Sequence, residues 1–407
     1  MICLLCCGQE KDCPQPRAGV LDLRERAECL GRLDLSGEWL AGPGRAPSSW
    51  HNHPLPAAWA EPLPPQGLAT YSLRIHLPAS YQPGIYGLQL HYVTSAYEVR
   101  VNESSVGGRG KPAEDDTYRA EGASQIIPFS VSVPDLQIQI VVANYTHARG
   151  GIRSRVFFGR FTELKSYYDR AMMLDGILAG GLILIGLYHF GLYYSRREMR
   201  STFYFGVFGL SVAVYSLCTG HHLIRLILPF SSNVWQLRIE YLSIALGIVT
   251  FLAYHRGVFP RRNWKVAVYV IFAFEFIYMA LVLFTPSLFF TQLVNLQQGM
   301  LMASVAYGLL SVIVAVYHRE PGARMVLAGF MVFGFTLIHD ILNNRNIILS
   351  TPLSAYGFLA FLLAQAYLIV KIFSNAFDSI SELTNQAIAT SRAYGRFVPR
   401  EFLKHLN

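Results

Sequence analysis

The sequence has few charged residues for its length. Only 15% of its 407 residues are charged, whereas 52% are hydrophobic, and the mean hydropathy is +0.31. A water-soluble chain carries more charge than this, so the composition excludes a wholly soluble protein. The apolar residues are concentrated after about residue 170, and Pro, Gly and polar residues before it. We therefore expect a soluble domain followed by a membrane-embedded one.

Cysteine is also scarce. Five of the six cysteines precede residue 30, where we expect the folded domain to begin, and the sixth, Cys218, lies in a hydrophobic run. The five are Cys3, Cys6, Cys7, Cys13 and Cys29. We therefore expect a soluble domain that does not depend on disulfides. Cys3 and Cys6 have the spacing of half a zinc site, but no second pair follows, so we predict no metal. Residues 1–29 are typical of the remnant of an export signal or lipoprotein leader.

Two classes of function lack the residues that they need. The net charge of +8 is not gathered into a basic stripe with interleaved aromatic residues, so we expect no nucleic acid partner. The one acidic cluster, Glu114-Asp115-Asp116, lies in a single loop. A glycosidase needs two carboxyl groups that face each other across a cleft, so hydrolysis of sugars is disfavoured.

The soluble region, residues 30–165, alternates apolar and polar residues with the period of a β-strand. In YSLRIHLP the apolar positions are Tyr71, Leu73, Ile75 and Leu77, and three later segments repeat the pattern. Gly, Pro and Asn separate these segments, so we predict a two-sheet antiparallel sandwich. Its tryptophans, Trp39, Trp50 and Trp59, could form a sugar-binding platform or fill the core.

A polar loop after the last long strand is our candidate ligand site. It carries Asn144, His147 and Arg149, followed by Gly150-Gly151. Such a loop can present donors to sugar hydroxyls or to a carboxylate. The alternative is a structural turn, in which Asn and Gly supply backbone angles and Arg149 pairs with a nearby acid.

The region 170–376 contains seven stretches long and apolar enough to cross the roughly 30 Å of membrane hydrocarbon. They cover about 172–194, 203–220, 233–254, 265–285, 291–317, 324–342 and 352–374. The loops after the first, third and fifth spans carry nine Lys and Arg residues, against two in the alternate loops. This distribution predicts an N-terminal domain outside the cell and a cytoplasmic C-terminus.

Six ionisable residues lie near the outer ends of these spans: His221, His222, Arg238, Glu240, His339 and Asp340. Because charge is expensive in lipid, they favour a polar network with two hydrogen-bonded arrangements, which couples the outer domain to the bundle. The alternative is a static packing network of Arg238 with Glu240 and His339 with Asp340. A metal site is disfavoured because no local spacing fixes the geometry of the ligands. Glu275 alone lies deep in a span.

Other seven-span classes lack their signatures here. A retinal protein needs a lysine within the last span, but Lys371 lies at its end. The third span ends in Tyr254-His255-Arg256 and not in the acidic-Arg-Tyr triplet of eukaryotic G-protein receptors. The sequence therefore supports neither class. A transporter with an accessory binding domain would be built from internal repeats, and none is evident.

Residues 377–407 follow the last span and are predicted to form a cytoplasmic signalling helix and the start of a linker. A short heptad stripe runs from the end of the last span into this helix. Its members are Ala376, Ile380, Leu383, Ala387, Thr390, Tyr394 and Phe397. Small and polar residues in this stripe predict a weak coiled coil that can change register, or else a solvated tail. Pro399 then predicts the end of the helix.

Several motifs resemble a known family. They are LDLSGEW (33–39), VVANYTHARGGI (141–152), GHHLIRLILP (220–229) and IHDILNN (338–344). The chain resembles bacterial seven-transmembrane receptors with diverse intracellular signalling modules. The resemblance implies a jelly-roll, galactose-binding-like outer domain, a carbohydrate or carboxylated solute as ligand, and a place in the bacterial inner membrane.

The C-terminal string YGRFVPREFLKHL (394–406) is similar to the segment that precedes the catalytic domain of bacterial class III adenylate and guanylate cyclases. This resemblance implies a homodimer and a cytoplasmic cyclase as output. The chain lacks the metal-binding aspartates of a cyclase, so we expect no catalytic residue and no cofactor within it. The alternative functions are a transporter and a glycan-binding membrane protein that does not signal.

Overall fold

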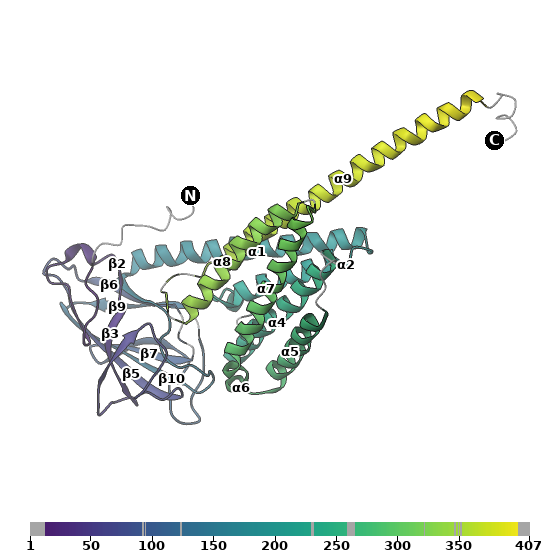
Figure 1. The fold of residues 1–407 in the computed structure, drawn as a ribbon. Helices are drawn as coiled ribbons and strands as arrows, with labels where there is room; N and C mark the ends of the chain where they lie inside the picture. Colours follow the sequence, from purple (N-terminus) through teal and green to yellow (C-terminus); the bar gives the residue numbers. More distant parts are fainter. Residues whose placement is uncertain are drawn as a thin grey trace.

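The computed structural model describes residues 13–397, apart from 92, 94, 123, 229–231, 259–264, 321, 346, 349 and 351. A β-sandwich lies at one end of the molecule, a bundle of helices packs beside it, and one long helix projects from the bundle away from the sandwich (Figure 1).

The sandwich consists of two sheets. Its strands are β1 (Val20–Asp22), β2 (Arg32–Asp34), β3 (Gly37–Pro43), β4 (His51–Leu55), β5 (Gly67–His76), β6 (Gly84–Leu90), β7 (Ala96–Val101), β8 (Ser104–Arg109), β9 (Gln125–Val131), β10 (Asp135–Asn144) and β11 (Val156–Arg160). One sheet has the order β4-β3-β5-β10-β7-β8, with β1 beside β5, and the other has the order β2-β11-β6-β9. The predicted sandwich is confirmed, and all its strand pairs are antiparallel except β1 with β5.

The alternation along the strands places the core where the sequence predicts it. Tyr71, Leu73 and Ile75 of β5 are all 0% exposed and pack against the inner face of the other sheet. Trp39 and Trp59 also belong to this core, which contradicts an exposed platform made of all three tryptophans.

The sandwich begins earlier than residue 30. Strand β1 pairs in parallel with β5, from Val20 opposite Arg74 to Asp22 opposite His76. Cys13 and Cys29 form a disulfide, and Cys29 is buried in the sandwich core. The expectation of a domain without disulfides is therefore wrong. It depended on a domain that begins at residue 30, and a short strand that pairs with a distant one, as β1 does with β5, gives no local signal of its partner. The sequence predicts a leader over residues 1–29, but the stretch that holds β1 and this disulfide belongs to the sandwich, and residues 1–12 lie outside the described residues.

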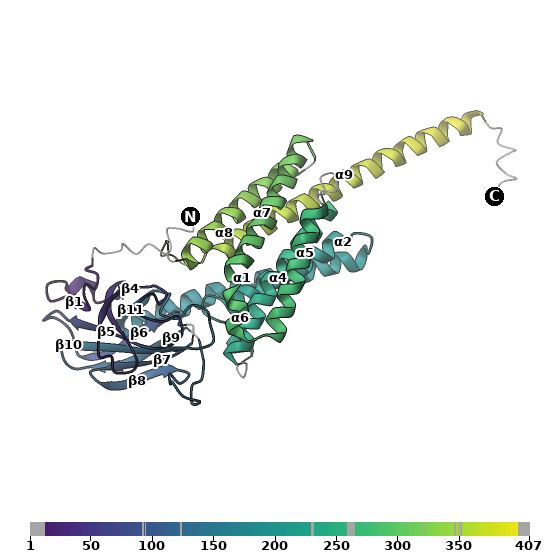
Figure 2. The ribbon, with the colours of Figure 1, turned by 60° about the horizontal axis from the view of Figure 1, so that its bottom comes forward.

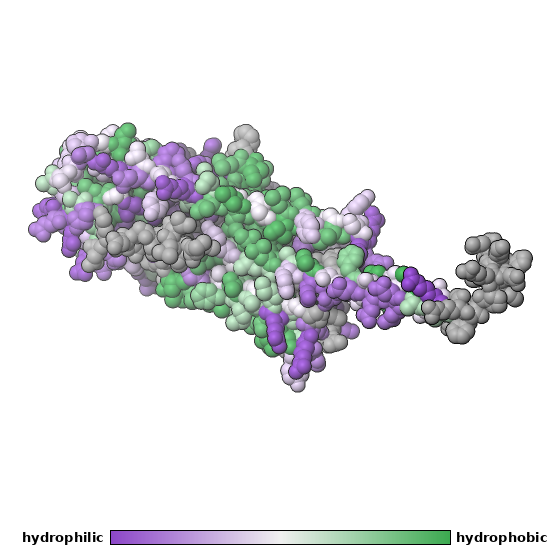
Figure 3. Space-filling view, turned by 90° about the horizontal axis from the view of Figure 1, so that it is seen from above, coloured by the Kyte–Doolittle hydropathy of each residue, from purple (hydrophilic) through white to green (hydrophobic). Residues whose placement is uncertain are grey.

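The membrane region consists of helices α1 (Phe161–Ser195), α2 (Arg200–Cys218), α3 (Ile224–Ile227), α4 (Asn233–Val258), α5 (Lys265–Phe284), α6 (Ser287–Gln292), α7 (Val294–Tyr317), α8 (Ala323–Asn344) and α9 (Ser354–Phe397). Within the described residues, α1, α2, α4, α5, α7 and most of α8 are long and apolar enough to cross a membrane. Their side chains form the hydrophobic belt between the polar sandwich and the polar tail (Figure 3). The seventh span stays a prediction, because the described apolar part of α9, Ser354–Tyr367, is shorter than the others.

Helix α9 is continuous from the bundle into the projecting tail (Figure 2). It packs against α8 over its first turns, and from Phe377 to Ala393 its side chains are exposed. Ile380 is 60% exposed and Leu383 64%, so the predicted stripe has no partner within the described part of the chain. Ala387 is exposed too, and Tyr394 and Phe397 lie in the last turn of the helix. Pro399 lies outside the described residues.

Candidate functional site

The loop after β10 is built by its own side chains. Asn144 and His147 are 0% and 4% exposed. The amide of Asn144 donates to the carbonyl oxygens of Pro65 (2.9 Å) and His147 (2.8 Å), and Nδ1 of His147 accepts from the backbone N–H of Arg149 (3.0 Å). These polar atoms are therefore used to shape the turn, as the structural alternative predicts. A ligand-binding role for Asn144 and His147 stays a prediction.

The same loop leads directly onto the helices. The backbone N–H of Ala148 donates to Oγ1 of Thr291 in α6 (3.0 Å), and Nη2 of Arg149 donates to Oδ1 of Asn295 in α7 (2.8 Å). The loop can pack in this way because residue 150 is glycine, since a Cβ there would lie 2.3 Å from the ring of Trp59. Arg149 thus pairs with an amide of the bundle and not with an acid of the sandwich.

A second contact joins the loop between β8 and β9 to α3 and α4. Glu121 accepts from Arg109 within the sandwich (3.0 Å) and lies 3.8 Å from Nη1 of Arg225 in α3. Arg225 in turn donates from Nε to Oε1 of Gln236 in α4 (2.6 Å). A line of charged and polar side chains therefore runs from the sandwich into the bundle.

This line ends at His222, which has two competing partners. Nδ1 of His222 lies 2.6 Å from the carbonyl oxygen of Cys218 and 2.6 Å from Nε2 of Gln236. A neutral imidazole nitrogen can either donate to the carbonyl or accept from the amide, but cannot do both. The site therefore offers two hydrogen-bond arrangements at one position, 5% exposed, below the sandwich.

A third contact is a cluster of rings. Nδ1 of His221 donates to Oδ2 of Asp175 in α1 (2.8 Å). The ring centroid of His221 lies 5.0 Å from that of His91, at the end of β6, and 4.9 Å from that of Tyr168 in α1. The Tyr168 hydroxyl donates to the carbonyl oxygen of Ser124 in the sandwich (3.2 Å). Helix α1 is thus held to both halves of the molecule.

The predicted pairing of Arg238 with Glu240 is not found among the described residues. The guanidinium of Arg238 donates to the carbonyl oxygens of Leu283 and Thr285, where α5 ends. The two side chains point differently because they lie only two residues apart on α4. Glu240 instead lies within electrostatic reach of Arg153, in the sandwich loop before β11.

The predicted pair of His339 with Asp340 does form, with 3.0 Å between Nδ1 and Oδ1. Asp340 also accepts the backbone N–H groups of Leu353 (2.7 Å) and Ser354 (2.8 Å). These are the groups that the first turn of α9 leaves without partners inside the helix. Asp340 therefore ties the end of α8 to the start of the projecting helix.

The six predicted coupling residues lie among these contacts, and sequence reasoning missed the residues opposite them. Glu121, Arg225, Gln236, Asp175 and Asn295 complete the contacts. The only local signal was that Arg225, Asp175 and Gln236 are polar residues within or beside apolar segments. The described residues contain no group of three or more His, Cys, Asp or Glu side chains that could hold a metal ion.

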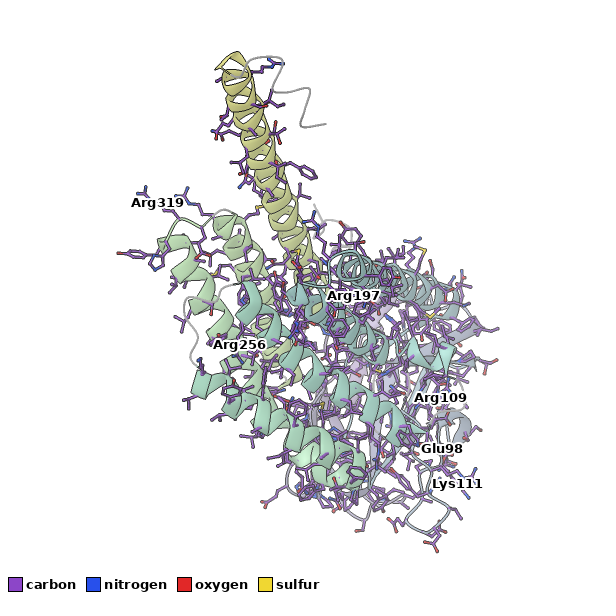
Figure 4. The ribbon with its side chains drawn as sticks, turned by 90° about the vertical axis from the view of Figure 1, so that its right-hand side faces the viewer. Glu98, Arg109, Lys111, Arg197, Arg256 and Arg319 are labelled. Atoms are coloured by element: carbon purple, nitrogen blue, oxygen red, sulfur yellow. A yellow bond between two sulfur atoms is a disulfide. The ribbon has the colours of Figure 1, made fainter. Side chains whose placement is uncertain are left out.

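The opposite end of the bundle carries the basic loops. Arg197 and Arg319 lie in the turns after α1 and α7, and Arg256 lies in the last turn of α4. Helices α1, α4 and α7 begin beside the sandwich, so their other ends, which carry these three arginines, lie away from it. Figure 4 labels the three arginines on the bundle, and Glu98, Arg109 and Lys111 on the sandwich. The arginines of these loops therefore lie at the end from which α9 projects.

Histidine titration in the sandwich predicts acid sensitivity. Burial, followed by the neighbouring His221, lowers the pKa of His91 to about 3, and burial lowers the pKa of His147 well below its usual value. These groups bind fewer protons in the folded protein than in the unfolded chain, whose histidines titrate near about pH 6.5. Their contribution to the free energy of unfolding should be fully present above that pH. It should be lost as the pH drops toward the pKa values of the folded protein.

We expect the melting temperature of the purified protein to be level above about pH 7 and to decline below about pH 6. His91→Phe, which keeps a ring against His221, should make the decline shallower, whereas His51→Phe on the exposed part of β4 should not. Equal acid sensitivity of the two variants and the parent protein would contradict the assignment.

These features define a class: a multi-pass membrane protein whose β-sandwich is docked on a helical bundle. Within that class, residues 171–372 match the family described as 7TM diverse intracellular signalling. The helical bundle belongs to this family of transmembrane sensory receptors, and the resemblance in the sequence motifs of the membrane region is confirmed. No curated protein gives a significant match.

Several solved structures share the sandwich only. A GH2 beta-galacturonidase from Eisenbergiella tayi is 16% identical over 32% of this chain and 24% of its own, with a TM-score of 0.25. A glycosyl hydrolase family 2 member from Bacteroides cellulosilyticus is 15% identical over 32% of this chain and 20% of its own, with a TM-score of 0.26. A beta-glucuronidase from Ruminococcus gnavus is 13% identical over 31% of this chain and 29% of its own, with a TM-score of 0.26. The chain thus spans under a third of each, and the likeness carries no argument about ligands.

Proposed function

We propose that this chain is the sensing and transmitting part of a receptor in the bacterial plasma membrane. The sandwich lies outside the cytoplasm and binds a solute, the bundle changes between two arrangements, and α9 passes the change to a class III nucleotide cyclase. The cyclase either follows residue 407 in a longer protein or is a separate partner.

One observation carries this proposal: the sandwich loops contact the same bundle whose last helix continues into the tail. The loops reach α3, α4, α6 and α7, and the first residue of α9, Ser354, is hydrogen-bonded to Asp340 of α8. A movement of the sandwich therefore acts on helix ends, and α9 is one uninterrupted helix of 44 residues that can carry it. The alternative partners of His222 provide a candidate for the element with two states.

The distribution of charge supports the orientation. Arg197, Arg256 and Arg319 lie at the ends of α1, α4 and α7 away from the sandwich, and basic residues of this kind are typical of cytoplasmic loops. The projecting part of α9 is then cytoplasmic. Its exposed Ile380 and Leu383 are one turn apart on one face of the helix, so we propose that two copies pair along this stripe and bring two cyclase domains together.

Arg149 favours a carboxylated solute over a neutral sugar. Burial, followed by the neighbouring charges of Arg153 and Arg345, lowers the pKa of Arg149, and its hydrogen-bond partner Asn295 is neutral. Arginines that lie close together attract an anion, and a carboxylate can accept two parallel hydrogen bonds from one guanidinium. Such a ligand would compete with Asn295 for Arg149 and so loosen the contact with α7.

The test uses the full chain in lipid nanodiscs with a panel of neutral and carboxylated sugars. We expect a carboxylated member to raise the melting temperature and to change the distance between spin labels on Leu383→Cys in α9. Arg149→Gln should abolish both effects. Arg45→Gln is the matched control, because Arg45 pairs with Glu98 away from the bundle (2.7 Å).

Two outcomes would contradict the proposal. Binding without any change at position 383 would favour a glycan-binding protein that does not signal. Movement of the solute across a sealed vesicle membrane would favour a transporter.

A further inference from the structure

One pair of polar side chains lies deep in the bundle and takes no part in the sandwich contacts. Glu275, near the middle of α5, is 0% exposed, and Gln297 of α7 is 2% exposed. The buried face of α5 consists of Glu275 with Val268, Ile271, Tyr278 and Val282. Glu275 therefore points into the protein and not toward lipid.

The hydrogen bonds of this pair are incomplete. Nε2 of Gln297 donates to Oε2 of Glu275 at 2.9 Å. The other oxygen of each side chain, Oε1, is buried and has no hydrogen-bond partner among the described residues. When Glu275 is ionised, both of these oxygens are acceptors only. The ionised pair therefore lacks a donor for these two oxygens. A buried acceptor without a donor costs free energy, and a carboxylate charge in an apolar surrounding costs more.

We propose that Glu275 and Gln297 form a binding site for a single proton, which joins α5 to α7. The proton is held on Oε1 of Glu275 and is donated to Oε1 of Gln297, while the amide of Gln297 donates to Oε2. This proton provides a hydrogen-bond donor for Oε1 of Gln297, so that Oε1 of Glu275 also takes part in a hydrogen bond. It also neutralises the negative charge of the Glu275 carboxylate. When the proton leaves, a carboxylate remains that lacks a donor on one oxygen.

Neighbouring groups do not supply the missing donor. Tyr278, one turn along α5, lies within electrostatic reach of both Glu275 and Glu240, but its hydroxyl donates to the carbonyl oxygen of Phe290 (3.3 Å). A metal ion would need more oxygen ligands than this pair provides. The described residues contain no group of three or more His, Cys, Asp or Glu side chains that could hold one.

The test is infrared spectroscopy of the full chain in lipid nanodiscs at neutral pH, in H₂O and in D₂O. Subtracting the spectrum of Glu275→Gln from that of the parent protein should leave one carbonyl stretch of a protonated carboxyl group, which shifts in D₂O. The variant should still fold, because its amide can donate to Gln297 in place of the acid. Glu382→Gln, on the exposed part of α9, is the matched control and should remove carboxylate bands instead.

A second variant tests the partner and does not depend on the stability of the first. Gln297→Leu should shift the carbonyl stretch of the acid to that of a more weakly bonded group, and an unshifted stretch would overturn the pairing. Loss of carboxylate bands in Glu275→Gln would also overturn the proposal, because it would show an ionised group. If those bands respond to sodium chloride but not to choline chloride, the site binds a metal cation and not a proton. None of these outcomes depends on a ligand in the sandwich.

Discussion

Gly357→Ala is expected to push the start of α9 away from α8. A Cβ at position 357 would lie 1.9 Å from Oγ1 of Thr336 and 2.8 Å from both its Cβ and its Cγ2. Turning the Thr336 side chain to another rotamer cannot clear all three atoms, so the helices must separate. Overpacking of this kind costs about 3 kcal/mol of unfolding free energy. Unfolding of the full chain in mixed micelles by sodium dodecyl sulfate titration measures it.

The matched control is Gly180→Ala in α1, another membrane-span glycine, where an added Cβ has no neighbour within 4 Å. It should leave the stability unchanged or raise it slightly, since alanine is the better helix former. Thr336→Ala, combined with Gly357→Ala, removes two of the three clashing atoms and should restore part of the loss. Equal stability of the two single glycine variants would show that α8 and α9 are not packed as described.

Asp340→Ala is expected to have an effect of similar size at the same joint. The Asp340 carboxylate accepts the backbone N–H groups of Leu353 and Ser354 and contacts His339. Alanine would leave both N–H groups without a partner at the start of α9. Hydrogen bonds to a charged acceptor contribute about 1.5–3 kcal/mol each, so for the two of them we expect a loss of about 3–6 kcal/mol in the same titration.

Two comparisons separate this cap from a general effect of charge. Asp340→Asn keeps one side-chain acceptor and should lose less than Asp340→Ala. Asp378→Ala removes one carboxylate from the exposed part of α9, the helix that follows α8. It should lower the free energy of unfolding only slightly. If Asp378→Ala destabilises the protein as much as Asp340→Ala, the cap does not hold α9.

Both variants concern the point where a signal from the sandwich would enter α9. The start of α9 is held by Asp340 and by the close approach of Gly357 to Thr336, and further along by the Tyr254 hydroxyl, which donates to Gln365. A spin-label distance at position 383 should therefore broaden in Gly357→Ala and in Asp340→Ala, even where the sandwich still folds. This would separate a fault in transmission from a fault in ligand binding.

The sequence by itself determined the features that repeat locally. Alternation in the segment from Tyr71 to Ile75 predicted a strand with one buried face, and six of the seven apolar stretches predicted helices of membrane-spanning length. In a half-buried strand every second residue is apolar, and in a membrane span the residues facing lipid are apolar. Both patterns can therefore be recognised within a short stretch of sequence. The family motifs added the class of receptor.

Only the tertiary structure decided which polar groups meet. Ala148 bonds to Thr291 and Arg149 to Asn295, partners that are 143 and 146 residues away along the chain. The same holds for β1 beside β5, for the disulfide of Cys13 with Cys29, and for Arg238 with the end of α5. A hydrogen bond or a disulfide needs a particular partner at a particular distance. The residue type alone shows that a partner is needed, and the folded chain determines which one is within reach.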